Sequence, residues 1–220
     1  GFYVLNKRAE TQHTVEKKWD DNEDKLGLRA PITVQLKQNG VAYGAPVTLN
    51  AGNDWKYTFT GLPKSFNGKA YEYTVDEISV PAGYYNEVKT EDGKTTITNR
   101  LINPARVDLI FKKKLEGRSI IDGEFTFNLL NEDGEVLATT AAQADGTITF
   151  KDVTFEKVGT YKYKVVEVAG TDKTIQYDST EKEVTITVTQ GGNTYVASVA
   201  YPEEKNFNNK YTPPTTTTEI

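Results

Sequence analysis

Each half of the 220-residue sequence contains a lysine, a glutamate and an asparagine, in that order, on segments whose polar and apolar residues alternate. The three residues are Lys17, Glu77 and Asn99 in the first half, and Lys113, Glu167 and Asn209 in the second half. Residues two apart in an extended strand lie on the same face. Each of these six residues shares its face with aromatic or aliphatic neighbours, so we expect all six side chains to point into a hydrophobic core.

A lysine buried beside a glutamate has a chemical alternative to an ion pair. Burial lowers the pKa of the amine and raises the pKa of the acid, which favours a neutral amine beside a protonated carboxyl group. The neutral amine is a nucleophile, and the acid polarises a neighbouring asparagine carboxamide and carries protons to the departing nitrogen. The product is a Lys–Asn isopeptide bond with loss of ammonia, formed without a cofactor or an external enzyme. A simple salt bridge would also offset the cost of burying the two charges.

The pattern around the glutamates is an internal repeat. Residues 71–77 read Tyr-Glu-Tyr-Thr-Val-Asp-Glu, and residues 161–167 read Tyr-Lys-Tyr-Lys-Val-Val-Glu. Alternation places both tyrosines, the valine and the glutamate of each segment on one face. The neighbours of the candidate residues fall on the opposite face and are not expected to react: Lys18, Lys112, Lys114 and Asn208. The competing interpretation is a surface lysine, an edge glutamate and a turn asparagine, which the repetition of the order in both halves disfavours.

The elements that would carry these residues are all strands. Thr, Val and the 13 Tyr and 9 Phe favour β structure, turn pairs such as Asn39-Gly40 and Asp133-Gly134 recur, and no segment has a sustained helical period. The sequence therefore predicts an all-β protein of two tandem β-sandwich domains. The predicted boundaries are 1–10 for the end of a preceding module or a linker, 11–102 and 103–211 for the two domains, and 212–220 for a Thr/Pro-rich tail.

Composition excludes several classes of function. The net charge of −5 argues against nucleic-acid and anionic-membrane partners, and no apolar run is long enough to span a bilayer. With no cysteine and one histidine, thiolate and His-rich metal sites and most hydrolase triads are excluded, so no metal, no cofactor and no conventional enzyme are expected. We expect His13 to be an exposed strand residue, residues 20–24 to form a solvated acidic loop rather than a calcium site, and Trp19 and Trp55 to be core residues.

Specific segments of the two halves resemble two known families. Residues 15–21, 60–63, 71–77 and 97–99 resemble the B-type repeat domain of collagen-binding surface adhesins of Gram-positive bacteria. Residues 124–127, 153–161, 163–167, 177–180 and 207–210 resemble the isopeptide-containing domain of streptococcal-type major pilins. Both families are immunoglobulin-like sandwiches in which a lysine on the first strand bonds an asparagine on the last. The resemblance therefore implies crosslinks from Lys17 to Asn99 and from Lys113 to Asn209, with Glu77 and Glu167 as the catalytic acids.

The resemblance also implies a role and a location. It implies stalk modules of an extracellular, cell-wall-anchored adhesin or pilus subunit involved in virulence. The expected partners are neighbouring modules of the same chain, other pilus subunits, or peptidoglycan reached through a sortase. The segment Tyr201-Pro202-Glu203 departs from the lysine motif of backbone pilins, and a sorting signal is missing from these 220 residues. The alternative function is direct binding of a host matrix protein. Because the sequence lacks an initiator Met, we expect an internal piece of a longer protein, and Asn6 is a candidate acceptor for an upstream module.

Overall fold

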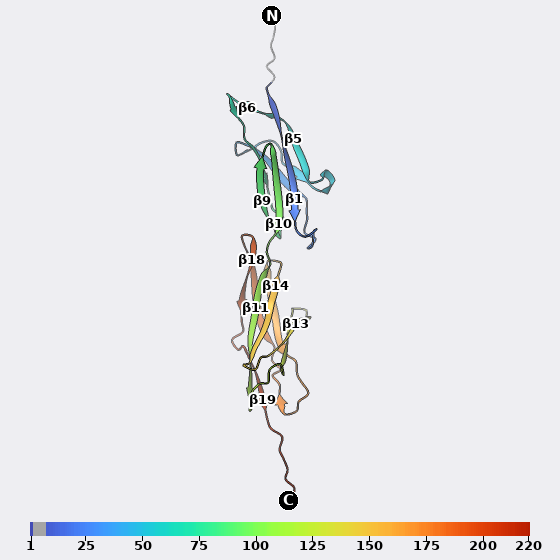
Figure 1. Cartoon of the computed structure of the whole chain (residues 1–220), viewed down its shortest axis with the longest axis vertical. Coiled ribbons are helices and arrows are strands. Elements are labelled where there is room, and N and C mark those ends of the chain that lie inside the picture. Colours follow the sequence, from blue (N-terminus) through green and yellow to red (C-terminus); the bar gives the residue numbers. More distant parts are fainter. Residues whose placement is uncertain (2–7) are drawn as a thin grey trace. The chain divides into compact units, whose positions relative to one another are not determined.

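The computed structural model describes residue 1 and residues 8–220, and it divides into two compact units, Gly1–Ile102 and Asn103–Ile220 (Figure 1). Asn6 and most of the predicted head segment lie outside the described residues. Almost all regular structure is β, which confirms the predicted all-β, immunoglobulin-like class. Among the described residues, no helix is long and apolar enough to cross a membrane.

The first unit is built from two main sheets. Its elements are β1 (Glu10–Asp20), β2 (Ile32–Gln38), β3 (Val41–Ala42), β4 (Val47–Leu49), the 3-10 turn η1 (Ala51–Asn53), β5 (Lys56–Pro63), β6 (Ser65–Phe66), β7 (Lys69–Ala70), β8 (Tyr73–Glu77), β9 (Tyr84–Glu91) and β10 (Lys94–Leu101). One sheet has the order β5-β1-β10-β9, and in the other β2 pairs with β3 and β4 on one side and with β8 on the other. The strands β6 and β7 form a separate hairpin.

The second unit repeats this plan with a larger second sheet. Its strands are β11 (Ala105–Glu116), β12 (Thr126–Leu130), β13 (Val136–Ala141), β14 (Thr147–Phe155), β15 (Gly159–Glu167), β16 (Ile175–Gln176), β17 (Lys182–Gly191), β18 (Thr194–Ala200) and β19 (Asn206–Tyr211). The two sheets have the orders β14-β11-β19-β16 and β13-β12-β15-β17-β18. Residues 212–220 contain no regular secondary structure.

In both units the first strand pairs in parallel with the last. β1 lies between β5 and β10, and β11 lies between β14 and β19 (Figure 1). All the other strand pairs in the two units are antiparallel. The strand that carries the glutamate pairs with the second strand of its unit in chain order, β8 with β2 and β15 with β12.

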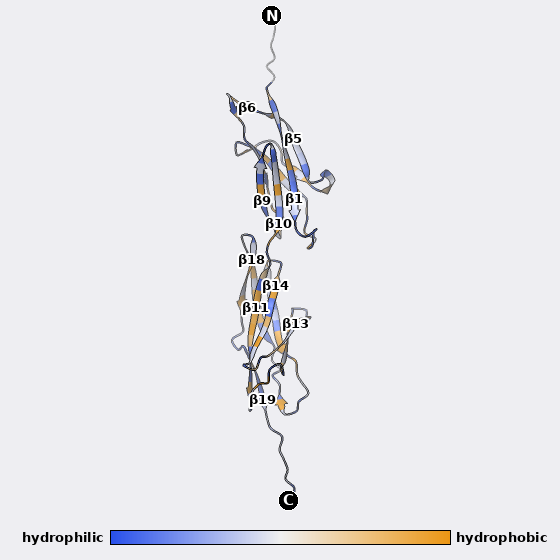
Figure 2. Ribbon diagram, viewed as in Figure 1, coloured by the Kyte–Doolittle hydropathy of each residue, from blue (hydrophilic) through white to orange (hydrophobic). Residues whose placement is uncertain are grey.

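Period-2 alternation explains which face of each strand is buried. Buried and more exposed positions alternate along β10, where a few hydrophobic residues lie among hydrophilic ones (Figure 2), and the buried hydrophobic residues from both sheets of the first unit form a single core. The core residues are Val15, Ile32, Val34, Leu36, Leu49, Leu62, Tyr73, Val75 and Ile97. In the second unit, the rings of Phe127 on β12 and Phe207 on β19 lie 5.1 Å apart and join the two sheets. Trp19 and Trp55 pack against the first core.

One sequence expectation about the first unit is wrong, and another holds for most of the residues it concerns. His13 is buried rather than exposed, and its Nε2 lies 2.7 Å from the Thr95 hydroxyl. The acidic loop is exposed or half-buried except at Asp21, which is buried and whose two carboxylate oxygens accept hydrogen bonds from the Arg29 guanidinium at 2.6 and 2.8 Å. This pairing, together with a hydrogen bond from the Tyr84 hydroxyl, compensates the buried charge. The loop is therefore anchored to the core at Asp21.

Candidate crosslinking sites in the two cores

The six predicted residues lie on corresponding strands of the two units. Lys17, Glu77 and Asn99 lie on β1, β8 and β10, and Lys113, Glu167 and Asn209 lie on β11, β15 and β19. In each parallel pair of first and last strands, the lysine is paired with the residue two positions before the asparagine. Lys17 pairs with Ile97, and Lys113 pairs with Phe207. This shared register places the lysine and the asparagine on the same inward face, in neighbouring rows.

In the second unit the three side chains form a continuous hydrogen-bonded chain. Lys113 Nζ donates to Glu167 Oε2 at 3.0 Å, and Asn209 Nδ2 donates to Glu167 Oε1 at 2.6 Å. Both the lysine and the glutamate side chains have 0% exposure. The backbone N–H of Asp178 donates to Asn209 Oδ1 at 2.7 Å. The glutamate therefore bridges the amine and the carboxamide, which are the two groups that an isopeptide bond would join.

Burial sets the protonation of this pair. Desolvation lowers the pKa of Lys113, although the adjacent Glu167 opposes the shift. Desolvation raises the pKa of Glu167, opposed by its hydrogen bonds from Asn209 and Lys113. The two pKa values are therefore driven toward each other, so moving the proton from the ammonium to the carboxylate costs less than it does in water.

In the first unit the glutamate holds two amides instead of an amine. Asn99 Nδ2 donates to Glu77 Oε1 at 2.9 Å, and Asn86 Nδ2, from β9, donates to Glu77 Oε2 at 3.0 Å. Asn99 is fully buried, and its Oδ1 has no hydrogen-bond partner among the residues that the structure describes. The acceptor end of the carboxamide is therefore unoccupied in this unit.

The lysine of the first unit lies in an aromatic pocket. Lys17 Nζ lies 3.4 Å from the centroid of the Trp19 ring and donates to the Lys18 backbone carbonyl at 3.1 Å. Burial lowers the pKa of Lys17 to about 8, against the opposing negative charges of Glu77 and Asp21. More of this amine than of an ordinary lysine is therefore neutral, and nucleophilic, near neutral pH.

Residues that alternation assigned to the opposite face point away from the two cores. Lys18, Lys114 and Asn208 are exposed, and Lys112 is half-buried. Within residues 1 and 8–220, no group of three or more His, Cys, Asp or Glu side chains is arranged to hold a metal ion.

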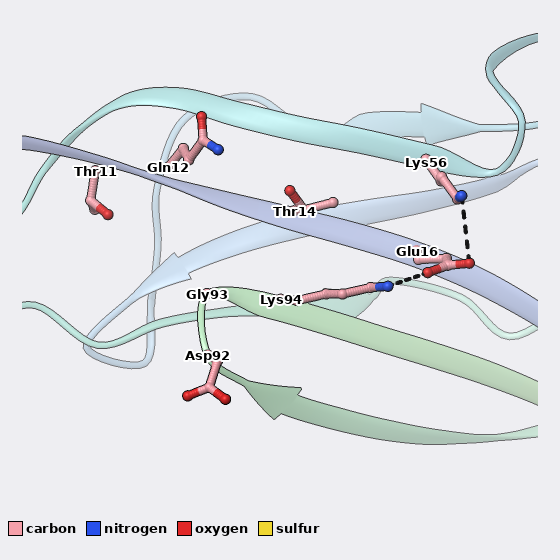
Figure 3. Close-up of a pocket in the computed structure, with 8 residues that line it drawn as sticks. All are labelled: Thr11, Gln12, Thr14, Glu16, Lys56, Asp92, Gly93 and Lys94. Atoms are coloured by element: carbon pink, nitrogen blue, oxygen red, sulfur yellow. Dashed lines mark ion pairs between the residues drawn. The ribbon is translucent and has the colours of Figure 1, made fainter.

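A polar groove of about 570 Å³ lies on the opposite face of β1 from Lys17. Toward one end of it Glu16 lies between Lys56 and Lys94 and forms an ion pair with each (Figure 3). Alternation along β1 places Glu16 outward, so this groove is separate from the buried triad. The charge of this carboxylate is already balanced by the two lysines.

A second groove, of about 310 Å³, lies at an edge of the first unit and was not expected from the sequence. Its lining includes Tyr43, Tyr57 and Phe59, and Tyr57 is 42% exposed. The Tyr57 and Phe59 rings contact each other edge to face at 4.9 Å.

Two domain families match the chain in the order that the sequence predicted. Residues 13–100 match the Cna protein B-type domain, and residues 109–212 match the Spy0128-like isopeptide containing domain. Domains of both kinds are structural modules rather than enzymes. The lysine, glutamate and asparagine of each triad all fall inside the corresponding matched range.

Similarity to individual proteins extends along the whole chain. A collagen adhesin of Staphylococcus aureus is 32% identical over 228 residues, a match that covers 100% of this chain and 17% of the adhesin. A solved structure of two B repeat units of the S. aureus collagen-binding protein is 29% identical and covers 93% of this chain and 50% of its own, with a TM-score of 0.48. The full-length major pilin of Streptococcus pneumoniae is 16% identical and covers 92% of this chain and 48% of its own, with a TM-score of 0.32.

Proposed function

Because the chain consists of a Cna B-type domain followed by a Spy0128-like isopeptide-containing domain, we propose that it is a self-crosslinked stalk segment of a bacterial surface adhesin or pilus subunit. Each domain forms one bond, Lys17 to Asn99 in the first and Lys113 to Asn209 in the second. The stalk belongs to a longer extracellular chain that a sortase attaches to the cell wall or to other pilus subunits. Its partners are the neighbouring modules of that chain.

The observation that carries this proposal is the buried chain of contacts from Lys113 through Glu167 to Asn209. A proton passes from the ammonium to Glu167, and the neutral Nζ attacks Cγ of Asn209. The protonated Glu167 then supplies a proton to Nδ2, which leaves as ammonia, and Glu167 takes up the second proton that Nζ loses as the amide forms. In the first unit the strand register is the same, but the reaction starts from the neutral amine of Lys17, and Glu77, which is hydrogen-bonded to Asn99, transfers a proton from Nζ to the leaving Nδ2.

The bond has a mechanical consequence because of where it lies. Tension along the chain enters each domain at its first strand and leaves at its last strand, and these are the two strands that the bond joins. The residues between Lys17 and Asn99, and between Lys113 and Asn209, are then bypassed by the force. Unlike a disulfide, the amide is not cleaved by reduction.

The intact mass of the denatured chain tests this proposal. Each bond removes one ammonia, about 17 Da, so we expect a deficit of about twice that value relative to the sequence mass. Peptide mapping then identifies the joined residues. A single loss would mean that one unit is an ordinary sandwich, and an unchanged mass would remove the crosslinking mechanism altogether.

Adjacent residues provide matched controls for the mapping. Asn209→Ala should abolish the bond of the second unit, whereas Asn208→Ala, one position away on the exposed face, should leave it intact. Lys113→Ala and Lys114→Ala form the same kind of pair on β11. Loss of the bond in the exposed variants would contradict the assignment of the reacting residues.

Direct binding of a host matrix protein is the competing function, and the aromatic groove of the first unit is where it would be sought. A stalk segment should show no saturable binding to immobilised collagen, the ligand that the name of the S. aureus relative indicates. Saturable binding that Tyr57→Ser abolishes would instead favour an adhesive module.

A further inference from the structure

A loop of the second unit contacts the carboxamide that the proposed reaction attacks. This loop follows β16, and the Asp178 N–H donates to Asn209 Oδ1 at 2.7 Å. The nitrogen of the same carboxamide donates to Glu167 Oε1 at 2.6 Å. The oxygen and the nitrogen of the carboxamide are thus held by different elements, and its plane is fixed before any bond forms.

The Asp178 carboxylate fixes this loop in place. Its Oδ1 accepts hydrogen bonds from the backbone N–H of Thr180 at 2.9 Å and from the Thr180 hydroxyl at 2.6 Å. Its Oδ2 accepts a hydrogen bond from the Asn208 N–H at 2.8 Å. One carboxylate therefore ties the loop both to itself and to β19, next to the reacting asparagine.

Packing of the preceding tyrosine fixes the loop from the other side. The Tyr177 ring contacts Phe125 edge to face at 6.2 Å, and the Phe125 ring lies 4.9 Å from Lys113 Nζ. Tyr177 also packs closely on Gly170, where a Cβ atom would lie 2.3 Å from the tyrosine hydroxyl. A side chain at position 170 would push the ring, and with it the start of the loop.

We infer that the backbone N–H of Asp178 stabilises the oxyanion of the crosslinking reaction in the second unit, and that the Asp178 carboxylate is the positioning group that aims it. This inference rests on the proposed crosslink. When Lys113 Nζ bonds to Cγ of Asn209, the carbonyl electron pair moves onto Oδ1, which becomes an oxyanion. The C=O bond re-forms as the Cγ–Nδ2 bond breaks, and Nδ2 leaves as ammonia with the proton that Nζ released through Glu167.

The position of the donor suits this role. Preorganised N–H donors 2.7–3.1 Å from a developing oxyanion give some of the largest single contributions to acyl-transfer rates, and loss of one donor costs roughly 10²–10³ in rate. In the first unit, by contrast, Asn99 Oδ1 has no such donor among the described residues. The inference therefore predicts faster bond formation in the second unit than in the first.

The test measures the rate of each bond in newly made chains. The 220-residue chain is synthesised in a cell-free system, translation is stopped, and samples are mapped over time for both crosslinks. Only chains that resist limited proteolysis are counted, so the rate refers to folded molecules. Asp178→Ala should slow the second bond about tenfold or more, since it loosens the donor without deleting it. Asp178→Asn, which keeps the acceptor for Thr180, should restore part of the rate.

The chain offers a matched control for loosening such a loop. Asp172 accepts the same two hydrogen bonds, from the Thr174 N–H at 2.9 Å and the Thr174 hydroxyl at 2.6 Å, and it does not contact the reacting carboxamide. Asp172→Ala should leave both rates unchanged, and the bond of the first unit serves as a reference inside every sample. Gly170→Ala, which keeps the Asp178 carboxylate, should slow the second bond less than Asp178→Ala does.

The outcomes separate this inference from the proposed function. A wild-type rate in Asp178→Ala, or equal slowing by Asp178→Ala and Asp172→Ala, would overturn the oxyanion role and leave the crosslink standing. If Asp178→Ala chains do not become protease-resistant, the rate of the second bond is measured in Asp178→Asn and Gly170→Ala chains instead. Wild-type rates in both variants would then overturn the oxyanion role. A wild-type second unit that never loses ammonia would refute the proposed function itself.

Discussion

The two units place the same three residue types in the same strand register, yet the contacts of these residues differ. In the second unit, Lys113 donates directly to Glu167. In the first, Lys17 contacts an indole ring and a backbone carbonyl, and Asn86 occupies the glutamate oxygen that corresponds to the lysine's partner in the second unit. The difference teaches that strand register places the lysine and the asparagine on the same inward face. The surrounding side chains decide whether the lysine is ion-paired or a free amine before the reaction.

The largest expected effect comes from removing the acid of one unit at a time. Glu167→Gln should abolish the bond of the second unit and leave that of the first, and Glu77→Gln should do the reverse, because a carboxamide cannot carry the proton. Each bond closes a loop of 82 residue steps (from 17 to 99) or 96 residue steps (from 113 to 209). By analogy with disulfides, its loss should lower the free energy of unfolding by about 4.5 kcal/mol.

Intact mass and thermal unfolding of four chains check this prediction: the wild type, the two single variants and the double variant. The double variant should have the full sequence mass and the lowest melting temperature. A single variant that loses both bonds would show that the units do not react independently, and one that keeps both would show that the glutamates are not the acids.

The second largest expected effect is a difference between the two units in how the rate of bond formation depends on pH. In the first unit the reactive species is neutral Lys17, whose pKa is lowered to about 8 by burial, against Glu77 and Asp21 and with the help of the nearby positive charge of Arg29. Its rate should therefore rise about tenfold per pH unit below that value and level off above it. In the second unit, the ion pair and its neutral form hold the same number of protons, so the rate should vary little around neutrality.

Mapping both bonds over time between pH 5.5 and 9, in a range where both units stay folded, measures the two profiles in one sample. Parallel profiles would contradict the contrast drawn between a free amine and an ion-paired one.

A smaller effect is expected from removing the competing amide of the first unit. Asn86→Ala leaves Glu77 Oε2 without its 3.0 Å hydrogen bond, so the oxygen becomes available to Lys17. We expect bond formation in the first unit to become a few-fold faster and more like that in the second. The rate of the second unit in the same chain is the control, and a slower first bond would show that Asn86 positions Glu77 productively.

The smallest effect concerns stability at low pH and is confined to the first unit, which contains the chain's one histidine. Burial lowers the pKa of His13, so the unfolded chain binds a proton more readily than the folded one. The corresponding stability is complete above the unfolded pKa of about 6.5 and decreases as the pH falls below it.

In the Glu77→Gln chain, the melting temperature of the first unit should therefore decrease between pH 7.5 and pH 5. The added substitution His13→Phe should make this decrease smaller. An identical pH response in the His13→Phe variant would assign the decrease to other groups.

Alternation was sufficient to predict much of this molecule. It assigned the strands, placed all six candidate residues on the inward face, and set their exposed neighbours aside. The same rule places His13 on the face of Val15 and Lys17, so its burial was predictable. The expectation that His13 is exposed gave too much weight to the polarity of the imidazole and too little to its position in the alternation along β1.

Contacts made by loops could not be predicted in this way. The ion pair of Asp21 with Arg29 and the hydrogen bond from Asp178 to Asn209 depend on loop conformations that have no repeating period. The surroundings of Glu77 likewise depend on Asn86, which reaches it from β9, whereas the contact of Lys17 with Trp19 follows from alternation, because the two residues are two apart on β1. Residue order therefore predicts the candidate residues, and the structure reveals the neighbours that other strands and loops supply.

The parallel pairing of first and last strands also governs when the bond can form. The two reacting residues of each unit are joined by almost the whole of that unit, so their contact is among the most non-local in the fold and is reached late in folding. A ribosome must finish the last strand before the lysine on the first has anything to attack. Ammonia loss by the proposed crosslink would thus be an irreversible record of folding, and the fraction of chains that keep the full mass would count the molecules that never reached the native state.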